Sequence, residues 1–569
     1  MIDFKEQIAE GLARETGLDK KDLLFKIETP PERKMGDYAF PTFTLAKTMR
    51  KNPAIIAQEL KEKLEGMEGI ADIVVAGPYL NFFIDTKTLA DHVLKAVVEE
   101  GDRFGASNLG EGKTVIVEYS SPNIAKPFHI GHIRTTIIGD SIKRIYKHLG
   151  YKVEAINHLG DYGTQFGMMI EAYKRWGDDE VIEKNPIPEL VKLYVRINKE
   201  AEEDKELLDN SREWFRKLES GDEEAVSLWQ WFRDLSLEEF KRVYDMLDVD
   251  FDSYRGESYY SDLMVKAVDE IKAKGLLVED QGAQIINLDK YNLPPSIIIK
   301  SDGSTIYLTR DIATAIFRKE HYDFYKNIYV VGSQQNLHFQ QLKAILKEMG
   351  YDWADDCIHV PFGMVSLPEG TLSTRKGKVV YLEDVLNRAV DKVEDILKER
   401  EETGGMKMEN RDELARQVGI GAVKFQELFN QRIKDYVFDW DRTLSFDGET
   451  GPYVQYTHAR MNSLLEKGGF DPKNKVDASL LSSEEEKELL QKLYGFNQVI
   501  VDSHEKYEPY FVTRYITDCA KTFNKYYTNT PILVDDEALK QARLLLVYGV
   551  KNMIRIGLDL LGIEAPDKM

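Results

Sequence analysis

Cysteine is scarce in this chain. Cys357 and Cys519 are the only two among 569 residues, and they stand far apart, in no ligand-like spacing with histidine. This pattern excludes a disulfide framework and predicts a reducing compartment. No apolar run reaches the ~18 residues that a membrane span requires. The first residues read as an amphipathic helix, unlike a secretory or organellar leader. We therefore expect a cytoplasmic protein with no membrane partner.

Basic residues are outnumbered as well. The chain has 76 Lys and Arg against 98 Asp and Glu, a formal net charge of −22. This acidity lowers the expectation of a nucleic-acid partner without excluding one, because phosphate contacts depend on local basic patches. The length exceeds the ~250 to 300 residues at which single cores stop growing, so we expect two or three domains.

The order of the patterns predicts three domains. Residues 1–110 mix helical patterns with short apolar strands and are typical of an α+β domain. In residues 111–390 strands alternate with helices, which predicts a doubly wound parallel sheet, interrupted at about 175–285 by a charged, aromatic helical insertion. Residues 391–569 are predicted to form an all-α bundle. Within the sheet domain, Asp302 and Gly303 predict a hairpin turn between two strands.

A strand that feeds a helix through "SSPNIAKPFHIGHIRTT", residues 120–136, has the chemistry of an anion site. Free backbone N–H groups and the helix dipole face such a turn. Gly131 would let a ligand approach the backbone, and His129 and His132 could donate hydrogen bonds to phosphate oxygens. The tetrapeptide alone is weak evidence. As a zinc site it is poor, since no Cys or acidic partner is near, and no metal ligands are predicted.

The second cationic element is the loop "TLSTRKGKVVYLEDV", residues 371–385. A mobile basic loop can close on a triphosphate and stabilise charge on the departing pyrophosphate. An isolated basic hexamer is more often a solvated surface turn, so its context matters. The residues concerned are Ser373, Thr374, Arg375, Lys376, Gly377 and Lys378.

Together, in this order and at the two ends of a doubly wound domain, the two elements resemble the signatures of class I aminoacyl-tRNA synthetases. The strings "SSPNIAKPFHIGHIR", "GDYGTQFG", "SDGSTIYLTRDIA", "VVGSQQNLHFQQL" and "LSTRKGK" are similar to the arginyl-tRNA synthetase family specifically. The resemblance spans the chain and includes "GETGPYVQYTHAR" near the C-terminus.

This resemblance implies ATP as a substrate, with Mg²⁺ assisting, and no structural metal. It implies a catalytic role for Lys126, His129, His132 and Lys376. The implied ATP-binding residues are these four together with Gly131, Ser373, Thr374 and Arg375. Because the loop reads STRKG, the position of its catalytic cation is ambiguous, and we expect Lys126 and Lys376 to act together.

The family pattern also implies a pocket for L-arginine. Glu118 and Asp311 would accept the planar fork of the guanidinium, and Tyr307 would pack against it. Asn123 and Gln335 would hold the α-amino group. Taken singly, Glu118 reads as a strand-end surface acid, Asn123 as a turn former and Asp311 as a helix cap.

The C-terminal bundle resembles the anticodon-binding domain of the family, which implies tRNA(Arg) as partner and a monomer as the usual state. Candidate RNA contacts are Tyr453, Gln455, Tyr456 and Arg460, although aromatics at helical spacing are more often core. The N-terminal module resembles a domain that touches the outer corner of the tRNA.

The implied function is arginine–tRNA ligase activity in protein synthesis, in which the amino acid is activated only when tRNA is bound. Two alternatives stay open. One is another nucleotide-activating enzyme, either a class I synthetase such as the cysteinyl enzyme or a small-molecule nucleotidylyltransferase. The other is an inactive paralogue that binds RNA for regulation.

Overall fold

A four-stranded parallel sheet lies at the centre of the computed structural model, which describes residues 3–126, 128–301, 303, 306–366, 380–403 and 410–569. Its strand order is β10-β9-β4-β5, and every neighbouring pair is parallel. The strands are β4 (Thr114–Glu118), β5 (Lys152–Ile156), β9 (Lys326–Gly332) and β10 (Cys357–Phe362). Strand order reverses at β4, as the prediction of a doubly wound sheet requires. Ligands bind at such a switch point, outside the carboxyl ends of the strands.

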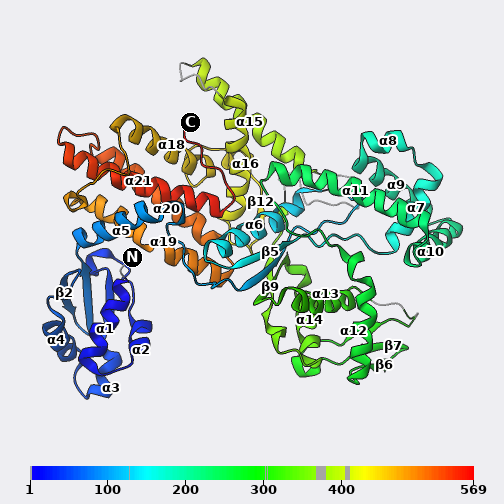
Figure 1. Ribbon diagram of the computed structural model, residues 1–569, viewed down its shortest axis with the longest axis horizontal. Coiled ribbons are helices and arrows are strands. Elements are labelled where there is room, and N and C mark those ends of the chain that lie inside the picture. Colours follow the sequence, from blue (N-terminus) through cyan, green and yellow to red (C-terminus); the bar gives the residue numbers. More distant parts are fainter. Residues whose placement is uncertain (1–2, 127, 302, 304–305, 367–379, 404–409) are drawn as a thin grey trace.

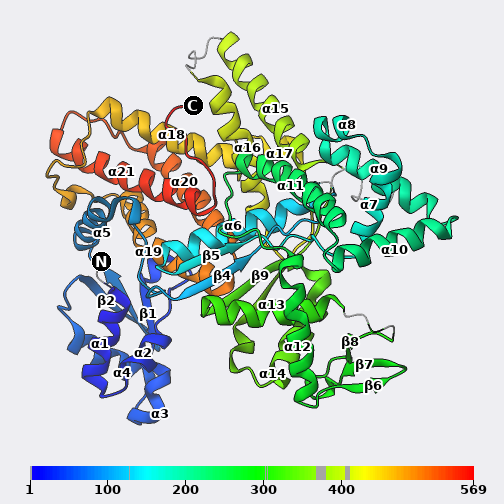
Figure 2. The ribbon, with the colours of Figure 1, turned by 45° about the vertical axis from the view of Figure 1, so that its right-hand side comes forward.

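Helices cover both faces of this sheet (Figure 2). Val115 and Val117 of β4 belong to the same core as Ile137 and Ile142 of α6 (Ile133–His148). Ile116 points the other way, into a core with α13 (Tyr307–Tyr322) and α14 (Asn336–Glu348). The strand is thus buried on both sides, which explains its unbroken apolar run.

A helical unit projects from one side of the sheet domain (Figure 1). It comprises α7 (Thr164–Trp176), α8 (Asp179–Lys184), α9 (Pro186–Glu200), α10 (Lys205–Glu219) and α11 (Glu223–Met246). It has its own core, which contains Met169, Leu190 and Phe232. Beyond Met246 the chain returns to the sheet, where the N–H groups of Asp252 and Ser253 donate to the carbonyl of Ala155.

The chain then builds a small unit beside α13. It contains α12 (Ser261–Ala273) and an antiparallel sheet of β6 (Val278–Asp280), β7 (Ala283–Ile286) and β8 (Ser296–Ile299). The hairpin predicted at 302–303 is wrong. β8 pairs with β7, and the residues from Tyr307 onward form α13. Leu308, Ile312 and Ala315 are buried at helical spacing. The apolar run was short enough to be read as a strand or a helix, and packing against α14 and the sheet favours the helix.

The N-terminal unit hangs from the opposite side of the molecule (Figure 1). Its helices are α1 (Phe4–Thr16), α2 (Lys20–Lys26), α3 (Ala46–Met49) and α4 (Pro53–Leu64). They pack on an antiparallel sheet of order β1-β3-β2, formed by β1 (Tyr38–Pro41), β2 (Ile70–Ala76) and β3 (Tyr79–Ile84). The next helix, α5 (Thr86–Glu100), was expected to belong to the domain of residues 1–110. It packs on α19 (Glu484–Lys506) and α21 (Glu537–Leu560) of the C-terminal bundle.

The C-terminal part is helical. It comprises α15 (Leu382–Glu402), α16 (Arg411–Phe429), α17 (Trp440–Thr443), α18 (Gly451–Gly468), α19 (Glu484–Lys506), α20 (Tyr510–Asn529) and α21 (Glu537–Leu560). A two-stranded parallel ladder joins β11 (Val365–Ser366) to β12 (Tyr436–Val437) and ties this part to the sheet domain. Within the described ranges, none of the helices has the length and apolar character needed to cross a bilayer.

Short 3₁₀ turns complete the fold. Those that bear on the site are η4 (Ile130–His132), η5 (Glu257–Tyr260) and η7 (Ser333–Gln335), whereas η8 (Asp352–Asp356) precedes β10 at the opposite edge of the sheet. The others in the described part of the chain are Arg33–Met35, Thr42–Leu45, Gly101–Arg103, Asp289–Tyr291 and Ala478–Leu480.

Candidate active site

The backbone between β4 and α6 is strained. Ser120, Ser121 and Ala125 have φ angles of 68°, 43° and 56°, a region that residues with a Cβ rarely adopt. Hydrogen bonds hold this path: the N–H of Ser120 donates to Thr135 Oγ1 at 3.0 Å, and that of Ala125 to Ser236 Oγ at 2.9 Å. Strain of this kind persists where the surroundings fix it, and it gathers at functional sites.

The two histidines form a closed turn at the start of α6. The N–H of Gly131 donates to Nδ1 of His129 at 3.0 Å, and the N–H of His129 donates to Nδ1 of His132 at 3.2 Å. A ring nitrogen that accepts leaves the proton on the other nitrogen. Burial lowers the pKa of both rings, that of His132 to about 3. Both imidazoles are therefore neutral at neutral pH. His129 keeps Nε2–H to donate; Nδ1 of His132 also lies 3.3 Å from the carbonyl of His129, and its ring has Nε2–H in the tautomer that accepts from the His129 N–H.

Gly131 serves this turn by its lack of a side chain. A Cβ at this position would lie 2.7 Å from Cε1 and 2.8 Å from Nδ1 of the His129 ring, closer than real contacts allow. The glycine is thus needed for the histidine ring to fold back over its own backbone.

The flanks of the second signature loop adjoin the histidine turn. The N–H of Ile130 donates to the carbonyl of Val380 at 3.1 Å, and the N–H of Leu382 donates to that of Phe128 at 2.9 Å. On the other flank, β11 contacts η4. The loop residues themselves, Ser373, Thr374, Arg375, Lys376, Gly377 and Lys378, lie outside the described residues. The two signature segments lie some 240 positions apart in the sequence. The described residues that border the second one thus contact the first.

Lys126 approaches the insertion. Its Nζ lies 5.7 Å from the centre of the Tyr194 ring on α9, and burial lowers its pKa. A cation over an aromatic face is held by the ring quadrupole.

Four carboxylates gather at the carboxyl edge of the sheet. Glu118 ends β4, Asp161 follows β5, Glu257 begins η5 and Asp311 lies in the second turn of α13. Burial raises the pKa of Glu257 to about 7; Arg310 opposes this shift, and the negative charges of Asp311, Asp161 and Glu118 add to it. The four acids therefore lie within electrostatic range of one another.

Three of these acids have a resident arginine. The shortest N–O distances are 2.6 Å for Glu118 with Arg318, 3.1 Å for Asp161 with Arg233, and 2.6 Å for Glu257 with Arg310. Asp311 differs, because its Oδ2 lies 2.6 Å from Nε2 of His338.

The other predicted arginine ligands come from three segments: the start of α13, η7 and the chain after β4. Tyr307 is the first residue of α13 and is 61% exposed, with its ring centre 5.5 Å from the guanidinium carbon of Arg310. Gln335 ends η7 beyond β9. Asn123 is exposed and lies against Gly160, where a Cβ would come within 2.2 Å of its Oδ1.

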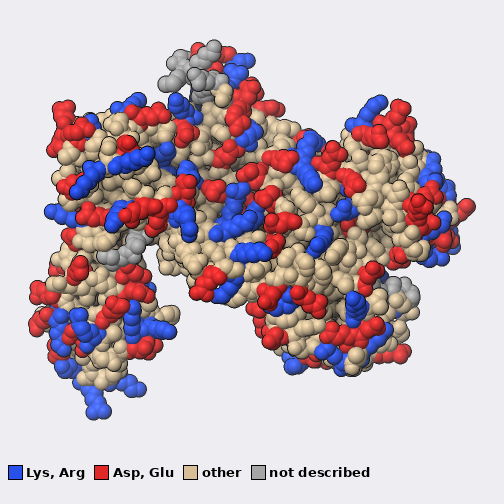
Figure 3. Space-filling model, viewed as in Figure 1, with Lys and Arg blue, Asp and Glu red and all other residues tan. Residues whose placement is uncertain are grey.

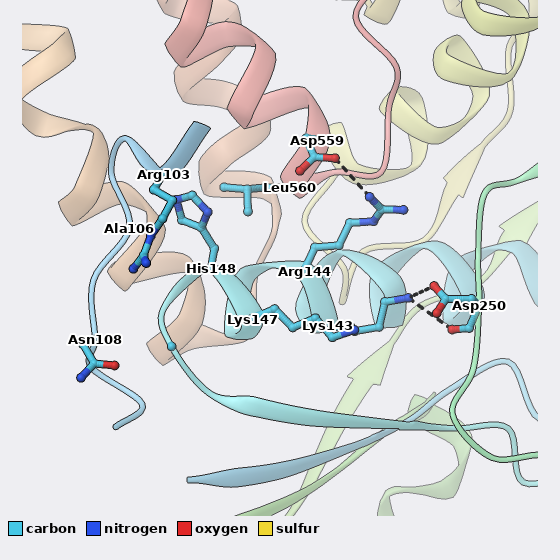
Figure 4. A pocket seen from close by; sticks show the side chains of 11 residues that line it. Arg103, Ala106, Asn108, Lys143, Arg144, Lys147, His148, Asp250, Asp559 and Leu560 are labelled. Atoms are coloured by element: carbon cyan, nitrogen blue, oxygen red, sulfur yellow. Dashed lines mark hydrogen bonds and ion pairs between the residues drawn. The ribbon is translucent and has the colours of Figure 1, made fainter. Parts of the chain in front are cut away.

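A cavity of about 650 Å³ lies elsewhere, at the last turns of α6 (Figure 4). Two of its four Lys and Arg side chains form ion pairs: Lys143 with Asp250 at 2.7 Å, and Arg144 with Asp559 at 3.2 Å. The C-terminus of a helix carries partial negative charge, which also favours cations here. The cavity is separated from the histidine turn by the length of α6 and forms no part of the candidate active site.

Comparison with known proteins identifies the family. Family models match residues 92–440 as "tRNA synthetases class I (R), catalytic domain", residues 454–569 as "DALR anticodon binding domain" and residues 3–84 as "Arginyl tRNA synthetase N terminal domain". The chain is 55% identical to the arginine–tRNA ligase of Halothermothrix orenii and 54% identical to that of Clostridioides difficile, each over the whole of both chains. The chain belongs to the arginyl-tRNA synthetase family.

Solved structures bear out the fold. The arginyl-tRNA synthetase of Thermus thermophilus superposes with a TM-score of 0.83 at 27% identity, covering 100% of this chain and 99% of that one. The Plasmodium falciparum enzyme superposes with a TM-score of 0.80 at 24% identity, covering 100% of this chain and 98% of that one. At this identity the likeness shows the fold alone. A doubly wound sheet flanked by an N-terminal α+β unit and a C-terminal helical bundle is the architecture of this synthetase family.

The predicted RNA contacts divide into two groups. Arg460 donates to Asn524 Oδ1 at 2.6 Å, and its guanidinium carbon lies 4.9 Å from the ring centre of Tyr456. Tyr453 accepts a hydrogen bond from the same asparagine. Gln455 is fully buried and donates to the carbonyls of Gln417 and Glu564 at 3.2 and 2.8 Å. It spans the bundle core, so the prediction of an RNA contact does not fit Gln455.

Sequence reasoning missed the residues that complete the acid cluster. Asp161 stands among the glycines of "GDYGTQFG" and His338 within "VVGSQQNLHFQQL", two strings already quoted for the family. For Glu257 in "RGES" and Arg318 in α13, no motif points to the site. In the described part of the chain no three His, Cys, Asp or Glu side chains form a metal site, and both cysteines are buried and free.

Proposed function

We propose that this synthetase joins L-arginine to the 3′-terminal adenosine of tRNA(Arg) in two ATP-dependent steps. Arginine first attacks the α-phosphate of ATP to give arginyl-adenylate and pyrophosphate. The terminal ribose of the tRNA then takes the arginyl group. The observation that carries the proposal is the meeting of the histidine turn with the flanks of the basic loop, in a chain whose sheet edge also gathers four carboxylates.

Charge stabilisation would come from the histidine turn. The neutral rings of His129 and His132 offer Nε2–H groups to phosphate oxygens without the cost of a buried charge, and such preorganised donors strengthen as charge develops at phosphorus. Lys126 and the loop cations, Lys376 foremost, would bind the β- and γ-phosphates of the magnesium complex of ATP. No covalent enzyme intermediate is needed, because positioning and electrostatics account for such a transfer.

Arginine would be selected by the charge and the hydrogen bonds of its pocket. Its guanidinium is always protonated and has five donors, which suit Asp311 and Glu118, with Tyr307 packed alongside. Asn123 and Gln335 would hold the α-amino group and leave the carboxylate free to attack. A neutral amino acid would leave buried polar groups unpaired, a penalty large enough to select without editing.

The RNA would bind over the helical bundle, where Tyr453, Tyr456 and Arg460 offer aromatic faces and a cation for unpaired bases. On the face shown in Figure 3, acidic and basic side chains are interspersed, so local patches rather than the net charge of −22 would bind phosphates. We place the RNA-contacting N-terminal domain at residues 1–110, the catalytic domain at 111–390 and the anticodon-binding domain at 391–569. We expect a monomer that works in the cytoplasm.

Arginylation tests the proposal. Purified protein is incubated with ATP, Mg²⁺, radiolabelled arginine and total tRNA, and acid-precipitable label is counted. We expect label that depends on tRNA and ATP, and exchange of pyrophosphate into ATP that depends on tRNA. Charging with cysteine, or tight RNA binding with no charging, would favour one of the alternative functions instead.

A further inference from the structure

Asp311 differs from the other acids of the cluster in its partner. Glu118, Asp161 and Glu257 are each paired with a resident arginine, at 2.6, 3.1 and 2.6 Å. Among the described residues, Asp311 is the one acid of the four with no Lys or Arg within ion-pair distance. The proposed substrate has a guanidinium that can pair with it.

His338 is the residue that holds Asp311. It lies in the first turn of α14, on a separate element from Asp311, and the two side chains are 24% and 29% exposed. Its Nε2 is 2.6 Å from Asp311 Oδ2, which leaves Oδ1 and a second lone pair on Oδ2 without a protein donor among the described contacts.

We propose that His338 is a positioning residue that determines specificity for arginine: its ring N–H fixes the Asp311 carboxylate at a place where the described residues provide no arginine, so that this place is left for the guanidinium of the substrate. This inference rests on the proposed function and deepens it. The other three acids show the contrast, because each is held by a resident arginine.

Three substitutions distinguish the hydrogen bond that holds Asp311 from the charge of the side chain that makes it. His338→Leu removes the donor at similar bulk, and His338→Gln provides an N–H donor at similar reach. His338→Arg supplies a resident cation. The readouts are kcat and the KM values for arginine and for ATP, measured on the full-length protein by tRNA-dependent pyrophosphate exchange.

We expect His338→Leu to raise the KM for arginine about ten- to a hundredfold, the range for a hydrogen bond to a charged group. His338→Gln stays within about threefold of the unaltered protein, because an N–H donor is kept. His338→Arg raises this KM at least as much as leucine does, since it pairs Asp311 in place of the substrate. The KM for ATP stays unchanged in all three.

Lys347→Ala is the matched control. It lies on the same helix, but its ion pair at 2.8 Å is with Asp355 in η8, which precedes β10 and so lies at the opposite edge of the sheet. We expect both KM values to be unchanged.

Several results would overturn the inference. One is an arginine KM for His338→Leu equal to that of the unaltered protein. A second is equal loss in His338→Leu and His338→Gln together with a raised KM for ATP, which indicates a purely structural role. A third is an unchanged arginine KM in Asp311→Asn while the unaltered protein still charges tRNA with arginine, which removes Asp311 from the pocket and leaves the proposed function intact. Failure of the unaltered protein to charge arginine would overturn both.

Discussion

His132 is the residue on which the proposed phosphate chemistry depends most. His132→Ala removes one preorganised donor, and we expect kcat for pyrophosphate exchange to fall by about 10² to 10³. The arginine KM should change little, because the ring is proposed to contact phosphate oxygens and not the amino acid. His148→Ala is the control: it is the last residue of α6, at the end far from His132, and lines the separate cavity. A His132 variant as active as the His148 variant would contradict the assignment.

Glu257 gives the site a pH dependence near neutrality. Its pKa is raised to about 7 by burial and by the neighbouring acids. Above this pH the carboxylate is charged and adds to the field that attracts the guanidinium. Below it the group is protonated and that contribution is lost. We therefore expect the KM for arginine to rise as pH falls from 8 to 6 in steady-state assays, and Glu257→Gln to flatten the profile. A flat profile in the unaltered protein would count against the charge model.

Single residues were predictable only where a motif carried them. Glu118 and Asp311 could be proposed from their place in family strings, but their partners Arg318 and His338 could not. Ion pairing depends on which helices pack beside the sheet, and nothing local in the sequence of α13 or α14 records that.

At the scale of elements, α6 carries the histidine turn and is locked to the bundle by one buried acid. Arg134, two residues after His132, donates from Nε to Glu427 of α16 at 2.5 Å, and Tyr436 of β12 donates its hydroxyl to the same carboxylate. β12 pairs in turn with β11, just before the second signature loop. Glu427 thereby joins both signature segments to α16 of the bundle.

This junction predicts a large effect on stability. Glu427→Gln leaves the guanidinium of Arg134 buried without its counter-charge, which costs about 3 to 5 kcal/mol. Tyr436→Phe removes one hydrogen bond and costs about 1 to 2 kcal/mol. Urea titration gives the free energies of unfolding. Glu413→Gln on the same helix breaks an exposed pair with Arg416 and should cost less than about 1 kcal/mol. Equal effects at Glu427 and Glu413 would refute a structural role for the junction.

Elements were predicted well where their pattern was clear, as for the strand and the helix that flank residues 120–136, which are β4 and α6. The failure at 302–303 has a physical reason. The run from Tyr307 is short and apolar enough for strand or helix, and only burial against α14 and the sheet decides between them. The packing of α5 on the bundle could not be predicted for a similar reason. Its apolar face does not indicate which neighbouring element covers it.

For the whole molecule, an acidic chain must bind a polyanion. If local patches do this work, binding of tRNA should release counterions and weaken as salt increases. We expect filter-binding affinity to fall by about tenfold or more between 50 and 200 mM salt. Arg460→Ala should weaken binding, whereas Gln455→Ala should mainly lower stability, because that side chain is buried. An affinity for tRNA that does not change with salt concentration would contradict an interface based on phosphate contacts.

The overall architecture was the most predictable feature, because alternation of strands and helices fixes a doubly wound sheet and the class I signatures fix its order. What the sequence did not provide was the meeting of distant parts, such as the pairing of Phe128 and Ile130 with Leu382 and Val380. Such contacts arise only when the folded chain closes on itself.

The central claim is that the histidine turn and the acid cluster form one site that activates arginine. Pyrophosphate exchange into ATP, measured on the full-length protein with each standard amino acid and with or without tRNA, tests it most directly. The account predicts exchange with arginine alone, dependent on tRNA, and abolished in Asp311→Asn. Exchange driven by another amino acid, or by arginine in the Asp311→Asn variant at an unchanged KM, would contradict it.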